Sequence, residues 1–290
     1  MLTRLGIFIL WLLHFLPLPL LAALGNALGL LLYALSAERR FVTATNLRLC
    51  FPELTEAQRT ALAKQNFQAF ARSFIERGIL WWSSPQRIQR LVHVVGQEHY
   101  ATAQAQGAVI LLVPHFVALD VGWSWLTQCG DLVSVYSNQK NPVFHQKLLE
   151  GRLRFGSSRL YSRQQGLRPI IKAMRASLPF YYLPDQDQGI RDGAFVSFFG
   201  VQAATLTAVP RLAEMADARV VPLIARMLPD GKGYELRFYP AWENYPTGDL
   251  AADTRRMNAF IEERVREIPE QYFWLHKRFK TRPKGEKRFY

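Results

Sequence analysis

The chain has 290 residues, of which 49% are apolar and 13% aromatic, so it is long and apolar enough for one sizeable folded domain and is not intrinsically disordered. Its two cysteines, Cys50 and Cys129, exclude a disulfide framework, which favours a reducing compartment. Lys and Arg outnumber Asp and Glu by 36 to 23, and the net charge of +13 indicates a polyanionic partner: nucleic acid, an anionic membrane, or an acidic substrate or carrier.

The N-terminal stretch predicts a membrane anchor over residues 1–37. No Asp, Glu, Lys or Arg lies between Leu5 and Ala37, and about 20 apolar residues suffice to cross a bilayer. Pro17 and Pro19 divide this stretch, so we expect a kinked span or a membrane hairpin in place of one straight helix. The stretch is too long for the apolar region of a signal peptide, and we therefore expect it to be retained.

The charges that flank this stretch predict its orientation. Arg39, Arg40 and Arg48 follow it, whereas only Arg4 precedes it. The positive-inside bias then places residues 38–290 on the cytoplasmic side. A basic protein beside anionic headgroups would bind nucleic acid only as a side effect, and we expect no nucleic-acid partner.

Strands and helices are expected to alternate in residues 38–290. Thr55 and Gln58 form a capping box that opens a helix. Strands are predicted at Leu91–Val95, Val109–Val113, Leu132–Tyr136, Phe180–Leu183, Arg219–Ala225 and Tyr234–Tyr239. Further helices are predicted at Ala118–Cys129, Val143–Phe155, Leu167–Ala176, Thr205–Ala216 and from Asp253 onward. This alternation predicts an α/β fold with a mostly parallel central sheet covered by helices on both faces.

Candidate chemistry begins where the second predicted strand ends. His115 follows Pro114 directly, and Asp120 comes five residues later, where a helix begins. A tight turn would bring the two side chains together, so that Asp120 holds one imidazole nitrogen while His115 takes a proton from a substrate hydroxyl. A histidine that simply ends a strand, with an ordinary helix-start carboxylate, is the alternative. No G-x-S-x-G or Walker motif offers another nucleophile or a nucleotide site.

Several blocks give this chain a family resemblance. Besides Pro114-His115-x4-Asp120, the blocks are Asn46-Leu47-x-x-Cys50-Phe51-Pro52-Glu53, Gly151-Arg152-Leu153-Arg154-Phe155-Gly156, Pro184-Asp185-Gln186-Asp187-Gln188-Gly189, Phe198-Phe199-Gly200-Val201-x-Ala203-Ala204-Thr205 and Gln271-Tyr272-Phe273-Trp274-x-His276-Lys277-Arg278-Phe279-Lys280-Thr281-Arg282-Pro283. In this order they resemble the bacterial lipid A secondary (late) acyltransferase family, within the wider glycerolipid acyltransferase-like superfamily.

The resemblance implies an acyltransferase that moves a fatty acyl chain from acyl carrier protein to a hydroxyl of a lipid A precursor, at the bacterial inner membrane. It implies His115 as the catalytic base and Asp120 as its acidic partner. Arg152, Arg154 and Asp185 are implied as substrate-binding residues, with the arginines favoured as a phosphate clamp. The family commonly has Glu where this chain has Asp120, and this departure bears on the acceptor.

Alternatives remain open at this stage. A related transferase could act on a lysophospholipid or another glycolipid, and a catalytically silent membrane-bound scaffold could recruit acidic partners through the basic tail after Lys277. Asp185 and Asp187 resemble a cation loop without further ligands, so we expect no metal and no cofactor beyond the acyl donor.

Overall fold

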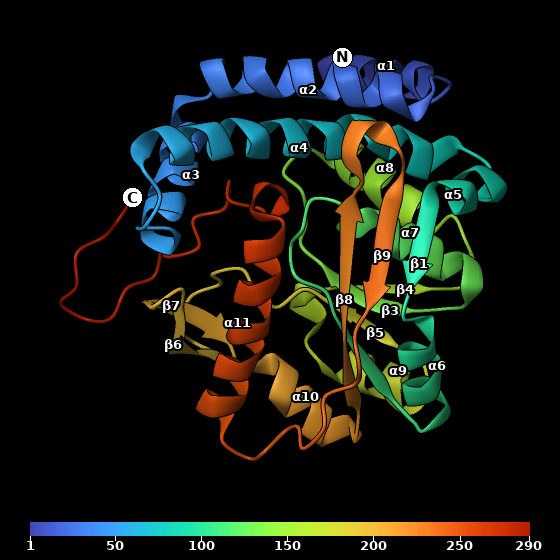
Figure 1. The fold of residues 1–290 in the computed structure, drawn as a ribbon. Helices are drawn as coiled ribbons and strands as arrows, with labels where there is room; N and C mark the ends of the chain where they lie inside the picture. Colours follow the sequence, from blue (N-terminus) through green and yellow to red (C-terminus); the bar gives the residue numbers. More distant parts are fainter.

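Seven strands form the central sheet of the structure, a computed structural model that describes residues 1–290, in the order β1-β9-β8-β2-β5-β3-β4 (Figure 1). All neighbouring pairs are parallel except β8 with β9. This confirms the mostly parallel α/β sheet. The strands are β1 (Val92–Val95), β2 (Val109–Leu112), β3 (Val133–Tyr136), β4 (Arg159–Ser162), β5 (Phe180–Tyr182), β8 (Arg219–Met227) and β9 (Tyr234–Phe238).

Helices cover both faces of this sheet. Thr55 caps α4 (Glu56–Trp82) through the predicted capping box. The helices after it are α5 (Pro85–Leu91), α6 (Gln97–Ala105), α7 (Leu119–Cys129), α8 (Pro142–Arg152), α9 (Arg168–Arg175), α10 (Ala208–Ala216) and α11 (Leu250–Glu267), and α3 (Ala37–Cys50) precedes it.

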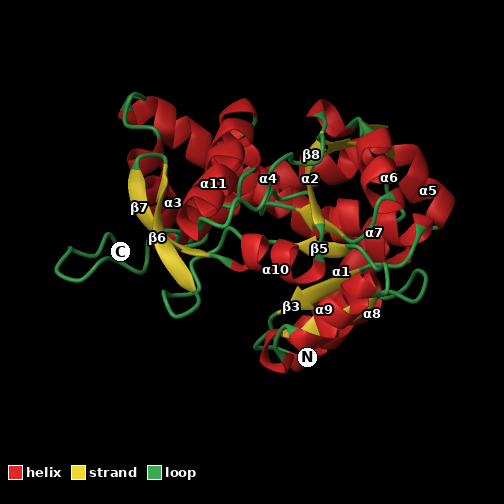
Figure 2. Cartoon of the chain, turned by 90° about the horizontal axis from the view of Figure 1, so that it is seen from below, coloured by secondary structure: helices red, strands yellow, loops and turns green.

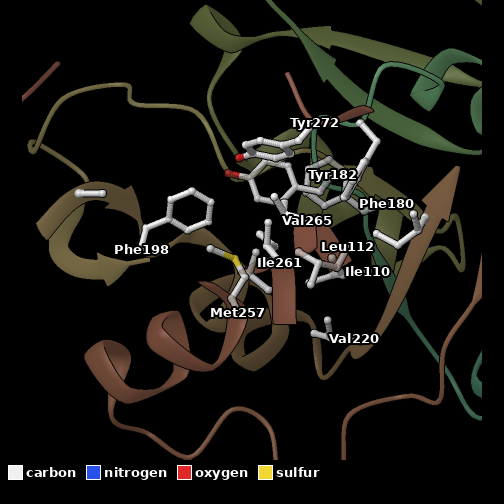
Figure 3. Close-up of a cluster of buried hydrophobic side chains, with 14 of the residues drawn as sticks. Ile110, Leu112, Phe180, Tyr182, Phe198, Val220, Met257, Ile261, Val265 and Tyr272 are labelled. Atoms are coloured by element: carbon white, nitrogen blue, oxygen red, sulfur yellow. The ribbon is translucent and has the colours of Figure 1, made fainter. Parts of the chain in front are cut away.

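The buried strand β2 shows how the two faces form. Successive side chains of a strand point to opposite faces. Ile110 and Leu112 therefore pack with Met257 and other residues of α9, α10 and α11 in one apolar cluster (Figure 3). Val109 and Leu111 pack with residues of α4, α5 and α7 in the other cluster. A strand buried on both faces reads as a continuous apolar run, as the sequence of β2 does.

The two N-terminal helices, α1 (Leu2–Leu13) and α2 (Leu18–Leu35), lie along α4 (Figure 1). The chain turns between them at Pro17, so the predicted division of the apolar stretch is confirmed. By length and composition α2 is a candidate membrane-spanning helix, and 28% of it is buried. Leu10 and Leu21 belong to the same apolar cluster as α4, while the proposed division of the chain at residue 37 stays a prediction.

A separate hairpin was not expected. β6 (Gly193–Phe198) and β7 (Val201–Leu206) pair antiparallel, apart from the central sheet and packed against α11 (Figure 2). The prediction of a helix from Thr205 is wrong at its start: Thr205 pairs with Ala194 in the hairpin, and α10 begins at Ala208.

Candidate active site

His115 lies just beyond the end of β2, at the edge of the sheet where the parallel strands end. Val113 continues the strand pairing through a hydrogen bond to the Tyr182 carbonyl, and Pro114 then ends it. Two residues later Phe116 bridges to Tyr272 near the C-terminus. Ligands collect at the carboxyl ends of the strands in open α/β sheets, so His115 occupies the edge at which a substrate is expected.

Asp185, which follows β5, is the carboxylate that holds His115. The backbone N–H of His115 donates to Asp185 Oδ2 over 2.9 Å, and its ring Nδ1 lies 2.6 Å from Asp185 Oδ1. The Tyr272 hydroxyl donates to Oδ2 over 2.8 Å. The Asp185 side chain is completely buried, whereas the His115 side chain is 19% exposed. The Asp185 carboxylate thus accepts three hydrogen bonds. Nε2, the other ring nitrogen of His115, has no protein partner.

The charge state of Asp185 follows from these contacts. Burial by itself would raise the pKa of the Asp185 carboxyl. The opposing charge of His115 and the hydrogen bonds from His115 and Tyr272 outweigh burial and lower the pKa to about 2. The carboxylate is therefore ionised at neutral pH, and its acceptor oxygen holds a proton on Nδ1 of the His115 ring.

Asp120 has different partners from the one expected. Its Oδ1 accepts from Arg152 Nε at 3.0 Å and Nη2 at 2.7 Å, and its Oδ2 accepts from Arg77 Nη2 at 2.9 Å. Burial would raise the pKa of Asp120, but the charges of Arg152 and Arg77 lower it to about 2. The predicted hydrogen bond between Asp120 and His115 is thus wrong: Asp120 stands in the first turn of α7 and both carboxylate oxygens are taken by arginines.

Both groups nevertheless face one cavity of about 470 Å³. His115, Asp120 and Arg152 belong to its polar lining, together with Ser134, Ser137, Gln139, Arg163, Gln186, Gln188 and Asp192. Its other walls come from the ends of β3 and β5, from α7 and from the loop before α9, and the apolar lining residues are Leu119, Trp123, Val135, Tyr136, Leu160, Leu167, Tyr181, Tyr182, Leu183, Leu206 and Ala208. A concave cavity that combines apolar walls with converging polar groups is the usual form of a binding site.

The C-terminal segment braces the turn that carries His115. Phe273 N–H donates to the His115 carbonyl and Val117 N–H donates to the Gln271 carbonyl, each over 2.9 Å. Two buried asparagines hold this segment in turn. Asn66 of α4 donates to the carbonyls of Glu270 and Tyr272, and Asn46 of α3 donates to those of Trp274 and His276.

Asp187 lies in the same loop as Asp185, but its contacts hold the loop in place and do not involve His115. Its carboxylate accepts from the N–H and hydroxyl of Thr281 and from Gly189 N–H. Its own N–H donates to Nε2 of His276, whose pKa burial lowers to about 4. Asp187 thus joins the loop after β5 to the C-terminal segment.

The structure brings four of the five predicted site residues, all except Arg154, to one region. The Arg154 guanidinium donates to the carbonyls of Leu80 and Ser83, over 2.7 Å each, and it does not line the cavity. Arg77 and Tyr272 are site residues that the sequence reasoning missed. Tyr272 belongs to the block Gln271–Pro283, which pointed to the family but not to a role for this residue. Arg77 lies inside the long helix α4, and no sequence motif distinguishes it there.

Comparisons with known proteins identify the family of this chain. The family model described as bacterial lipid A biosynthesis acyltransferase matches residues 1–281. Three similar relatives are from Escherichia coli (strain K12). A lipid A biosynthesis lauroyltransferase is 39% identical over 98% of this chain and 93% of its own length. A lipid A biosynthesis myristoyltransferase is 38% identical over 92% and 82%, and a lipid A biosynthesis palmitoleoyltransferase is 31% identical over 100% and 94%. The chain belongs to the bacterial lipid A biosynthesis acyltransferase family.

Proposed function

We propose that this protein transfers a fatty acyl chain from an acyl carrier protein thioester to a hydroxyl of a lipid A precursor, on the cytoplasmic side of the inner membrane. The observation that carries the proposal is the chain of hydrogen bonds from Tyr272 through Asp185 to His115, which ends at an apolar cavity. Membership of the family supports acyl transfer to lipid A.

In the proposed reaction His115 acts as the general base. Its Nε2 takes the proton of the acceptor hydroxyl, and the oxygen attacks the thioester carbonyl carbon. The tetrahedral intermediate collapses, the carbon–sulfur bond breaks, and the imidazolium returns the proton to the leaving thiolate. Asp185 stabilises the imidazolium and fixes the ring, which is the role that we first expected of Asp120.

Arg152 is the proposed donor to the developing oxyanion. The backbone N–H groups of His115, Phe116 and Val117 all donate to protein acceptors. These three groups are therefore not free to donate to the oxyanion. Arg152 donates to Asp120 through Nε and Nη2, and its Nη1 has no protein partner while its side chain lines the cavity. In this proposal Asp120 positions Arg152, and a preorganised cation at that place would stabilise negative charge in the transition state.

The proposal is tested by acyl transfer with purified variants. His115→Ala and Asp185→Asn should each lower kcat by about 10²–10⁴-fold, because one removes the base and the other its orienting charge. His93→Ala changes an exposed histidine away from the cavity and serves as the matched control. A folded His115→Ala protein with near-normal transfer would refute the mechanism.

The acceptor and the donor are tested separately. Mass spectrometry of lipid A from a strain lacking the gene should show a missing secondary acyl chain, whereas unchanged lipid A with altered phospholipids would point to a lysophospholipid or other glycolipid acceptor. Acyl transfer from acyl carrier protein thioesters, compared with coenzyme A thioesters, identifies the donor.

A further inference from the structure

The first 35 residues carry most of the apolar side chains that the fold leaves exposed. Of the 19 large apolar side chains that are exposed, 13 lie on α1, α2 and the turn between them: Met1, Leu2, Leu5, Phe8, Ile9, Trp11, Leu12, Phe15, Leu20, Leu24, Leu30, Leu31 and Leu35. We call these 13 side chains the lipid face. Exposed apolar side chains concentrated on two helices that both pack on α4 mark a contact with a membrane or another protein.

The opposite side of these helices is packed lengthwise on α4. A Cβ atom on Gly25 would lie 2.7 Å from the Arg72 Cα, and one on Gly29 would lie 2.4 Å from the Gln68 Cα. The backbones of α2 and α4 therefore touch at two successive turns of α2, where only glycine fits. Leu18 and Leu21 are buried on the same side.

Both ends of α1 are bonded to the domain that carries the cavity. Asn141, which caps α8, donates its side-chain N–H to Thr3 Oγ1 over 2.8 Å. At the other end, Arg87 of α5 donates to the carbonyls of His14 and Leu16. The start of α1 and its turn into α2 thus lie on the same side of the molecule, and neither reaches away from the domain.

We propose that α1 and α2 lie in the plane of the membrane, with the lipid face inserted into one leaflet, and that they do not cross it. At 1.5 Å per residue, α1 is about 18 Å long and falls well short of the roughly 30 Å hydrocarbon core. α2 is long enough to span, but its glycine face is packed lengthwise on α4. The exposed Arg4 and Arg39 flank the apolar stretch and suit anionic headgroups, as in helices that lie at a membrane interface.

This arrangement also places the cavity close to the membrane. Asn141, which holds Thr3 of α1, is two residues from Gln139, which lines the cavity. A lipid acceptor would then reach His115 without leaving its leaflet. Only this consequence rests on the proposed function; the position of α1 and α2 does not, and the tests below do not measure acyl transfer.

The first test measures binding of the purified full-length protein to vesicles of phosphatidylethanolamine and phosphatidylglycerol by flotation. The triple variant Leu20→Gln/Leu24→Gln/Leu31→Gln removes apolar surface from the lipid face. Its affinity for the vesicles should fall by about tenfold or more. Ile190→Gln/Met215→Gln, which changes exposed apolar residues elsewhere, should bind like the parent protein. Equal binding by the triple variant and the parent would overturn the proposal.

The second test separates an in-plane helix from a span and does not depend on the first. The Tyr33 ring lies 5.9 Å from Lys64 Nζ of α4, whereas Leu31 points away from α4. In a protein with Cys50 and Cys129 replaced by alanine, a short bis-maleimide should join Tyr33→Cys to Lys64→Cys in native membranes. The pair Leu31→Cys and Lys64→Cys should not be joined. Absence of the first cross-link would show that α2 leaves α4 in the membrane and would overturn the proposal.

Discussion

Asp185 carries a full negative charge at a completely buried position, so its titration is linked to the stability of the fold. Its pKa of about 2 lies below the value of an unfolded aspartate, near 3.9. A group with a lowered native pKa stabilises the protein above the unfolded pKa, and that contribution is lost as the pH falls toward the native pKa.

We therefore predict that the parent protein loses about 2 kcal/mol more stability than Asp185→Asn between pH 4 and pH 2. Asparagine keeps the shape of the side chain but does not titrate. The free energy of unfolding, measured by urea titration at each pH in the same detergent, checks this. Asp120 titrates in both proteins and cancels from the comparison. Parallel pH curves for the two proteins would contradict the prediction.

The position of His115 could be predicted from the sequence, but its partner could not. An apolar run that stops at Pro114 shows where the strand ends, and the structure places His115 there. Asp120 is near in sequence but begins α7, and its side chain meets Arg152 and Arg77. Asp185 follows β5, which pairs with β2, so the contact depends on strand order, and spacing along the chain carries no information about strand order.

At the level of elements, α3 and α4 hold the C-terminal segment that braces the site. Asn66 on α4 donates over 2.8 and 2.6 Å to the carbonyls of Glu270 and Tyr272, and all of these atoms are buried or partly buried. That segment donates through Phe273 to the His115 carbonyl and through Tyr272 to Asp185. α4 therefore positions the site without contacting the reacting atoms.

We predict that Asn66→Ala lowers the free energy of unfolding by about 2–3 kcal/mol, because two buried carbonyl groups lose their donor. It should also lower kcat more than it raises KM, since the brace orients His115 and Asp185 and leaves the cavity walls in place. Gln65→Ala, at the neighbouring exposed position of α4, is the control. Urea unfolding and steady-state kinetics measure both effects. An Asn66→Ala protein that is destabilised but has unchanged kcat would limit Asn66 to a structural role.

The strands of the central sheet show which elements a sequence can reveal. β2 and β8 are apolar runs buried on both faces, and the predicted ends of both lie within two residues of the observed ends. β4 and the hairpin of β6 and β7 were missed because they mix polar and apolar residues without a regular period. Their place is set by partners: β4 by β3, and the hairpin by α11.

At the scale of the whole molecule, α1 and α2 contribute buried side chains to the core as well as exposed apolar side chains to the surface. Leu10, Leu18 and Leu21 are buried in the cluster that contains Val109 and Leu111 of β2. Arg72 and Glu76 of α4 form a buried ion pair, and Tyr234 donates to the same glutamate. Because α2 lies directly over Arg72, removal of the first two helices would expose both the apolar cluster and this charged pair.

We therefore predict that a protein containing only residues 38–290 is much less stable than the full chain. Loss of the three buried leucines alone should cost about 5 kcal/mol or more, a large part of the roughly 5–15 kcal/mol that stabilises a typical protein. Thermal unfolding of both proteins in the same detergent measures the difference. Leu20→Gln/Leu24→Gln in the full chain changes only exposed residues of α2 and should keep the parent's Tm. A fragment with the Tm of the full chain would instead establish residues 1–37 as an independent anchor, since neither the leucines nor the contact over Arg72 would then contribute to the fold.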